Sequence, residues 1–179
     1  MFNFFKSNKL KSILRKNNRK HAFLDFDNIF SILVLFETKD YDVVDSFVEE
    51  LQKMGKTVAG YAFRVKDDVY DYSETNFKIV SNKEHLNKSG YPDDVLLKQL
   101  NTERYDAVID LTIKENFSLE YILATVNATM TIGLKKNKLP FYDLTISKLP
   151  QTKEAKVSPV RELIKSILFY LKTIKGNGT

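Results

Sequence analysis

Apolar residues along this chain gather in short runs that alternate with longer amphipathic stretches. Ser31–Phe36 reads SILVLF, an almost wholly apolar run that is typical of a strand buried on both faces of a parallel sheet. Similar short runs occur at Thr57–Phe63, Phe77–Val80, Ala107–Thr112 and Met130–Leu134. We expect these five segments to form the strands of one sheet.

The amphipathic stretches between these runs predict helices. The stretch from Tyr41 to Met54 places its apolar residues on one stripe, and Gly55 follows it in the position of a C-cap glycine. Further helices are expected at about 92–100, 118–127 and 158–174. The sequence therefore predicts an α/β fold with a doubly wound, mostly parallel, five-stranded Rossmann-like sheet. We expect the strand order 3-2-1-4-5, with helices on both faces and the last helix packed back across one face.

The length and the pattern suit one domain with an N-terminal extension. In a chain of 179 residues we expect a basic arm and linker over residues 1–30 and a single Rossmann-like domain over 31–174. Residues 175–179 should form a frayed tail. Residues 135–157, which include two prolines, should form a surface connection, and residues 22–30 should pack on the body through their aromatic side chains.

Charge is distributed unevenly along the chain. Residues 1–21 hold seven Lys or Arg and no acid, residues 22–147 hold 14 against 21 acids, and residues 148–179 hold seven against two. A basic arm binds a polyanion by releasing its counterions, while an acidic body stays away from it. The candidate nucleic-acid-binding residues of the arm are Lys6, Lys9, Lys11, Arg15, Lys16, Arg19 and Lys20.

The same arm has a helical apolar pattern. Leu10, Ile13 and Leu14 fall at helical spacing, so a short amphipathic helix is expected, ending near Asn17. The phenylalanines that precede it are Phe2, Phe4 and Phe5. We expect a non-enzymatic protein whose arm docks on the ribosome or its RNA and becomes ordered there. The alternatives are a protein partner, an anionic membrane surface that the apolar residues enter, and a merely solubilising tail.

Composition excludes several classes of site. The chain has no Cys, which excludes disulfides, thiolate metal sites and cysteine nucleophiles, and it has only two His, His21 and His85. We expect no metal, no cofactor and no catalytic residue. No apolar run is long enough to span a membrane, and the N-terminus lacks the apolar core and cleavage site of a signal peptide, so we expect a cytoplasmic protein.

A ligand site in such a sheet lies beyond the carboxyl ends of the strands, where the strand order reverses. Here that point falls between the first and fourth strands. The loop after the first strand has no glycine, so a phosphate loop or dinucleotide fingerprint is absent. The candidate residues of a ligand crevice are Glu37, Thr38, Lys39, Lys114, Glu115, Asn116 and Ser118.

One acidic residue, Asp110, lies inside an apolar strand near its carboxyl end. A carboxylate in this position is either a general base or metal ligand, or a structural hydrogen-bond acceptor for a neighbouring loop. The structural interpretation is favoured.

The segment from Tyr105 to Leu134 resembles part of a known enzyme family. Its strand, helix and second strand are similar to the N-terminal domain of heptosyltransferase-type glycosyltransferases with the two-domain B architecture. The matching positions are Tyr105, Asp106, Val108, Ile109, Asp110, Leu111, Ala128, Ile132 and Gly133. The chain also resembles an uncharacterised family of short proteins found mainly among Bacteroidota. The resemblance implies a half-fold without the sugar-nucleotide domain, and hence a degenerate ligand-binding or half-enzyme module as the alternative to a docking protein.

Overall fold

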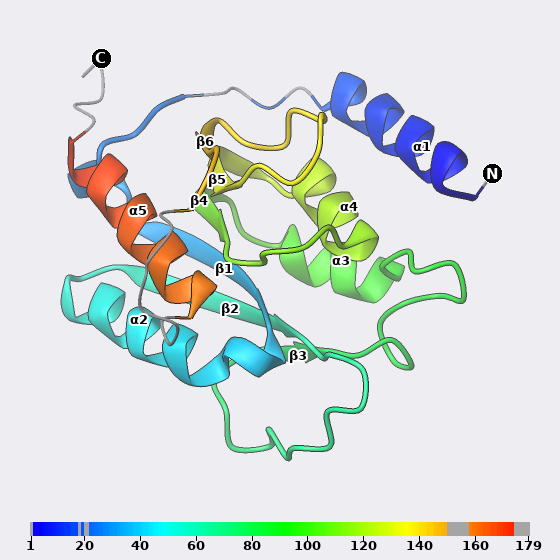
Figure 1. Ribbon diagram of the computed structural model, residues 1–179, viewed down its shortest axis with the longest axis horizontal. Helices are drawn as coiled ribbons and strands as arrows, with labels where there is room; N and C mark the ends of the chain where they lie inside the picture. Colours follow the sequence, from blue (N-terminus) through cyan, green and yellow to red (C-terminus); the bar gives the residue numbers. More distant parts are fainter. Residues whose placement is uncertain (1, 18, 20–21, 150–157, 174–179) are drawn as a thin grey trace.

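The computed structural model describes residues 2–17, 19, 22–149 and 158–173, and it has a parallel sheet with helices on both faces (Figure 1). The strands are β1 (Ser31–Glu37), β2 (Thr57–Phe63), β3 (Lys78–Val80), β4 (Tyr105–Asp110), β5 (Ala128–Leu134) and β6 (Leu144–Ile146). The α-helices are α1 (Phe2–Lys16), α2 (Tyr41–Lys53), α3 (Asp94–Leu100), α4 (Phe117–Thr125) and α5 (Pro159–Thr173). Short 3-10 turns occur at Phe26–Asn28 and Thr38–Asp40.

The strand order is β3-β2-β1-β4-β5-β6, and every pairing is parallel. This order confirms the predicted order of the first five strands. The sixth strand differs from the prediction, which has only a surface connection over residues 135–157. β6 pairs over three residues with β5, and Pro140 and Pro150 on either side of it favour a loop in the sequence pattern.

Alternate residues of β1 face two separate cores, as expected for a strand buried on both sides. Ile32, Val34 and Phe36 face a core that α2 and α5 cover. Leu33 and Leu35 face a second core, which α3 and α4 cover (Figure 1). The sheet is therefore the middle layer of a three-layer α/β domain.

Two element boundaries differ from the predictions. β4 begins at Tyr105, which pairs with Ala128, and it ends at Asp110, two residues before the predicted end. It ends there because the Asp110 side chain accepts hydrogen bonds from the backbone N–H and the hydroxyl of Thr112. The second boundary is the start of α4, which begins at Phe117 and not at the predicted Ser118. Its N-cap is Asn116, whose side chain accepts hydrogen bonds from the N–H groups of Ser118 and Leu119.

The N-terminal segment is a helix that lies outside α4 (Figure 1). Leu10 is only 2% exposed, and Ile13 and Leu14 pack against the same core as α4. The side-chain amide of Asn17 donates to the carbonyl of Ala124 at 2.9 Å, just after the helix ends. The predicted helix is confirmed, and in this structure the body covers its apolar face.

The linker packs on the body through Phe26, as expected, and through Leu24 and Ile29. Phe23 and Phe30 are more than half exposed, whereas Ile29 is fully buried.

In the part of the chain that the structure describes, no helix has the length and apolar character needed to cross a membrane.

Candidate functional site

Four of the seven predicted nucleic-acid-binding residues are exposed on α1, and one of them, Lys11, also lines a cavity between α1 and α4. Lys9, Lys11, Arg15 and Lys16 are exposed, and none of them pairs with an acid among the described residues. At 100° per residue, Lys9 and Lys16 form one row along the helix and Lys11 and Arg15 form another. The two rows flank the solvent face, so α1 presents a basic surface of about 10 Å in length. We call these four residues the basic face of α1.

Two other predicted residues are directed toward the protein. Nη1 of Arg19 lies 2.9 Å from Oδ2 of Asp143, and both side chains are less than a tenth exposed. Nζ of Lys6 lies 4.3 Å from the centre of the Phe117 ring. Lys20 lies outside the described residues. In this structure Arg19 is therefore engaged in a buried ion pair, whereas Lys9, Lys11, Arg15 and Lys16 are exposed.

The predicted crevice residues do not form one site. Thr38 is buried, donates to the carboxylate of Asp68 and accepts from the backbone N–H of Val65 at 3.2 Å, so it ties down the loop after β2. Glu37 and Lys39 pair with each other, and Lys114 is exposed.

Glu115 lies on the α1 side of α4, where it lines a cavity of about 540 Å³ together with Lys6 and Lys11. It thus faces a different cavity from the two remaining crevice residues, Asn116 and Ser118.

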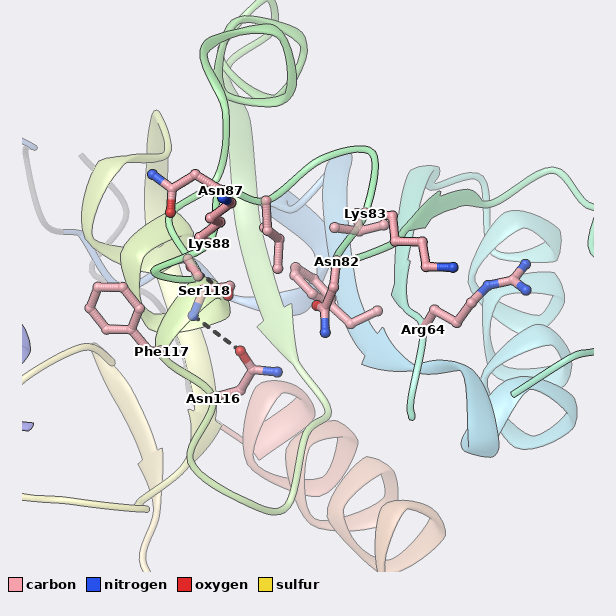
Figure 2. A pocket seen from close by; sticks show the side chains of 12 residues that line it. Arg64, Asn82, Lys83, Asn87, Lys88, Asn116, Phe117 and Ser118 are labelled. Carbon is pink, nitrogen blue, oxygen red and sulfur yellow. Dashed lines mark hydrogen bonds between the residues drawn. The ribbon is translucent and has the colours of Figure 1, made fainter. Parts of the chain in front are cut away.

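Asn116 and Ser118 line a separate cavity of about 660 Å³, which we call the β2–β3 pocket (Figure 2). Its opposite wall comes from the segments that follow β2 and β3, and not from the predicted loop after β1. The hydroxyl of Ser118 donates to the carbonyl of Gly90 at 2.7 Å and joins the two walls. The lining residues are Phe63, Arg64, Val80, Asn82, Lys83, Leu86, Asn87, Lys88, Gly90, Asn116, Phe117 and Ser118.

The lining of the β2–β3 pocket is basic. It includes Arg64, Lys83 and Lys88 and no carboxylate. Sequence reasoning missed these cations because it considered only the loops after strands 1 and 4. The signal was present in the predicted order 3-2-1-4, which places the carboxyl ends of β2 and β3 at the same edge as the start of α4.

A second group of polar side chains surrounds Asp110, which is fully buried. Its Oδ2 lies 2.5 Å from Nζ of Lys136 and 2.5 Å from the hydroxyl of Tyr142, while Oδ1 accepts from Thr112. Burial raises the pKa of Tyr142, and the negative charge of Asp110 raises it further, so Tyr142 remains a donor. These contacts agree with the structural interpretation of Asp110. No sequence pattern indicates Lys136 or Tyr142, because both lie in the segment expected to be a connection.

Glu120 of α4 lies next to this group and is 6% exposed. Burial, and to a lesser extent the negative charge of Glu115, raises its pKa to about 7. Its Oε1 accepts a 2.7 Å hydrogen bond from the side-chain amide of Asn137. Near neutral pH Glu120 therefore titrates at the edge of the cavity between α1 and α4.

The motif positions that carry the enzyme resemblance have packing roles in this fold. Asp106 accepts from the backbone N–H groups of Phe30 and Ser31, at 2.8 and 2.9 Å, and so fixes the start of β1. Gly133 gives room to the ring of Tyr142, since a Cβ at this position would lie 2.5 Å from Cε1 of that ring. Within the described residues, no group of three or more His, Asp or Glu is placed to hold a metal ion.

A model of the family of unknown function DUF6913 matches residues 3–174. The chain belongs to this family. The match begins inside α1 and ends just after α5, so it includes the basic face as well as the sheet. No curated protein and no solved structure matches the chain.

Proposed function

We propose that this DUF6913 protein is a non-enzymatic α/β protein that docks on structured RNA through the basic face of α1, with ribosomal RNA in the cytoplasm as its leading target. The observation that carries the proposal is the arrangement of α1. Its apolar side is held by α4, and two rows of exposed cations, none in an ion pair with an acid among the described residues, flank its solvent side.

The contrast between α1 and the body supports this proposal. The helix contains no acid, whereas residues 22–147 have more acids than bases. Such a protein is attracted to phosphates at one end and repelled elsewhere, which orients it on a polyanion. Arg15 and Lys16 also complement the dipole at the carboxyl end of α1, but Lys9 and Lys11 lie in the middle of the helix and gain nothing from it.

The mechanism is phosphate contact without base readout, since lysine and arginine on a helix surface position a protein on a backbone and carry little sequence information. A structured RNA with closely spaced phosphates suits the two rows of cations. The ribosome offers such RNA at high concentration, which makes ribosomal RNA the leading target.

The packing of α1 makes the membrane alternative less favourable. The residues that would enter the lipid are Phe2, Phe4, Phe5, Leu10, Ile13 and Leu14, and the last three already pack against the body. Membrane insertion would therefore require α1 to leave α4 and expose apolar surface on both elements. The half-glycosyltransferase alternative depends instead on whether the β2–β3 pocket binds a ligand.

The test is co-sedimentation of the full chain with ribosomes at several salt concentrations. We would compare the natural protein with the variant Lys9→Gln/Lys11→Gln/Arg15→Gln/Lys16→Gln. Substitution is preferable to deletion of α1, because deletion would uncover the buried surface of α4. Binding should weaken strongly in the variant, and the slope of log K against log salt should become shallower by roughly 0.7–0.9 for each phosphate that the variant no longer neutralises.

The matched control removes four exposed lysines elsewhere, as Lys53→Gln/Lys78→Gln/Lys98→Gln/Lys172→Gln. It has the same net charge as the α1 variant, so it should bind with nearly the natural affinity if the location of the charges matters. Equal weakening in both variants would mean nonspecific attraction. Unchanged binding in the α1 variant would overturn the proposal.

A further inference from the structure

The geometry points to a second binding site: we propose that the β2–β3 pocket binds a small organic phosphate, with the phosphate at Arg64 and Lys83. This site is independent of the basic face of α1. It lies beyond the carboxyl ends of β2 and β3 and reaches to the start of α4, on the edge of the sheet where parallel α/β folds bind their ligands (Figure 2).

The charge of the pocket selects for an anion. Arg64, Lys83 and Lys88 line it without any carboxylate, and Lys83 and Lys88 are exposed enough to meet a ligand. Figure 2 shows the side chains of Arg64 and Lys83 extending in the same direction at one end of the pocket. Two cations from different segments at one end favour a compact anionic group such as a phosphate.

The protein supplies hydrogen-bond acceptors for only some of the N–H donors of the Arg64 guanidinium. Its Nη1 donates to the backbone carbonyl of Asp68 at 3.3 Å, and the group lies 5.3 Å from the centre of the Tyr72 ring. Its Nε is buried and has no hydrogen-bond partner among the described residues. Such a donor is rare in a folded protein, and a rotation of the Arg64 side chain toward a bound anion would give it a partner.

Arg64 and Lys83 also border a neighbouring cavity that contains Asp67, Asp68 and Glu84. None of these three carboxylates lines the β2–β3 pocket, although the hydrogen bond from Thr38 and, to a lesser extent, the charge of Arg64 contribute to lowering the pKa of Asp68. The three carboxylates repel an anion from the second cavity, so the carboxylate-free β2–β3 pocket is the one that accepts it.

The rest of the pocket suits an organic body attached to the phosphate. Phe63 and Val80 form an apolar floor, with Leu86 beside them. Figure 2 shows Asn82 and Asn116 reaching into the space from opposite sides. The Oδ1 atom of Asn116 is occupied by the N–H groups of Ser118 and Leu119, so its amide NH₂ is the end left for a ligand.

A volume of about 660 Å³ is in the range of sites for small metabolites and cofactors. A nucleoside monophosphate and a sugar phosphate share the chemistry that this pocket recognises, namely a phosphate on a polar, partly apolar ring. The tests therefore use both kinds of compound, together with inorganic phosphate and the phosphate-free nucleoside.

The experiment is titration of the full chain with uridine 5′-monophosphate, glucose 6-phosphate, inorganic phosphate and uridine, followed by calorimetry and by ¹⁵N NMR. At millimolar concentration at least one of the two organic phosphates should bind, more tightly than inorganic phosphate, and uridine should not. The side-chain amide signals of Asn82 and Asn116 should shift on binding. No binding by either organic phosphate would overturn the proposal, as would equal binding of uridine or of inorganic phosphate.

The variant Lys83→Gln/Lys88→Gln changes only exposed side chains and should fold normally. This variant should lower the affinity for the organic phosphate about tenfold or more, which is the usual effect of removing charge-assisted hydrogen bonds. Arg64→Gln should have at least the same effect. The matched control Lys53→Gln/Lys98→Gln should bind with the natural affinity, and equal weakening in the control would contradict the assignment.

The proposal of a phosphate site can be overturned without overturning the proposed function, because the variants that test it leave the basic face of α1 intact. Ribosome co-sedimentation should be the same for Lys83→Gln/Lys88→Gln as for the natural protein. If that variant instead failed to bind ribosomes while no organic phosphate bound, the pocket would be part of an RNA surface, and the small-molecule assignment would be overturned.

Discussion

The hydroxyl of Tyr142 donates a 2.5 Å hydrogen bond to Oδ2 of Asp110, a residue with no exposed surface. The same oxygen lies 2.5 Å from Nζ of Lys136, whose side chain is 4% exposed. Asp110 ends β4, and its two partners belong to the segment that connects β5 to β6. The carboxylate therefore fastens this connection to the centre of the sheet.

Asp110→Asn should lower the free energy of unfolding by about 3–5 kcal/mol, because Lys136 stays buried without its counter-charge. Urea denaturation followed by circular dichroism measures this change. The control Asp110→Asn/Lys136→Met removes both charges and should recover much of the stability. If the double variant were as unstable as the sum of the single ones, the two residues would not be coupled.

Gly133→Ala should destabilise the protein by about 1–3 kcal/mol, because the new Cβ would overlap the ring of Tyr142. The closest approach would be 2.5 Å to Cε1, with Cζ at 2.8 Å. The cost should nearly vanish in a Tyr142→Ala background, where the ring is gone. Thermal or urea unfolding of the four proteins in this cycle gives the coupling. An undiminished cost in that background would show that backbone conformation, and not the ring, requires glycine.

The sheet was predictable because each of its first five strands is an apolar run that sequence patterns reveal directly. β6 and the network around Asp110 were not, because Lys136 and Tyr142 acquire their roles only through contact with a distant strand. Local sequence also does not distinguish the cations of the arm that face solvent from Arg19, which forms an ion pair with Asp143 near β6 at the edge of the sheet.

The candidate pocket was half predictable for a similar reason. Asn116 and Ser118 follow β4 and were expected at the crevice, and they do line a cavity. Arg64 and Lys83 follow other strands, in polar loops that carry no motif. Two features bring Arg64 and Lys83 close to the start of α4. The sequence predicted the first, the strand order, but it did not predict the second, the path of the loops.

Arg19→Gln should lower stability by about 3 kcal/mol, because it leaves Asp143 buried without its cation. The same change should leave the salt dependence of RNA binding unaltered under conditions in which the variant is folded. Arg15→Gln is the matched control, since Arg15 is exposed on the same segment. It should keep full stability and make the salt slope shallower by up to about 0.9. The reverse pattern would show that Arg19 belongs to the RNA surface after all.

Leu10→Ala should cost about 2–5 kcal/mol if α1 unfolds together with the body, since Leu10 is almost fully buried. Hydrogen exchange in α1 and α4 gives the readout. Exchange should accelerate in both helices, because their apolar faces protect each other. The control Ser12→Ala changes an exposed position of the same helix and should have little effect. Faster exchange in α1 alone would mean that the helix is a loosely attached arm.

Glu120→Gln should stabilise the protein at high pH and have little effect at low pH. The pKa of Glu120 is about 7 in the folded protein, against an ordinary value of 4.5. Between these values the unfolded chain releases the proton while the folded protein keeps it, so stability falls as pH rises through this window. Below it both states are protonated and the penalty disappears.

At about pH 8 the variant should therefore be more stable than the natural protein by about 1–3 kcal/mol, while near pH 4.5 the two should agree. Gln keeps an oxygen that accepts from Asn137, so the hydrogen bond at Oε1 is preserved. Urea unfolding across this pH range gives the difference, with the exposed Glu74→Gln as control. A constant difference at every pH would mean that packing at Glu120, and not its ionisation, sets the effect.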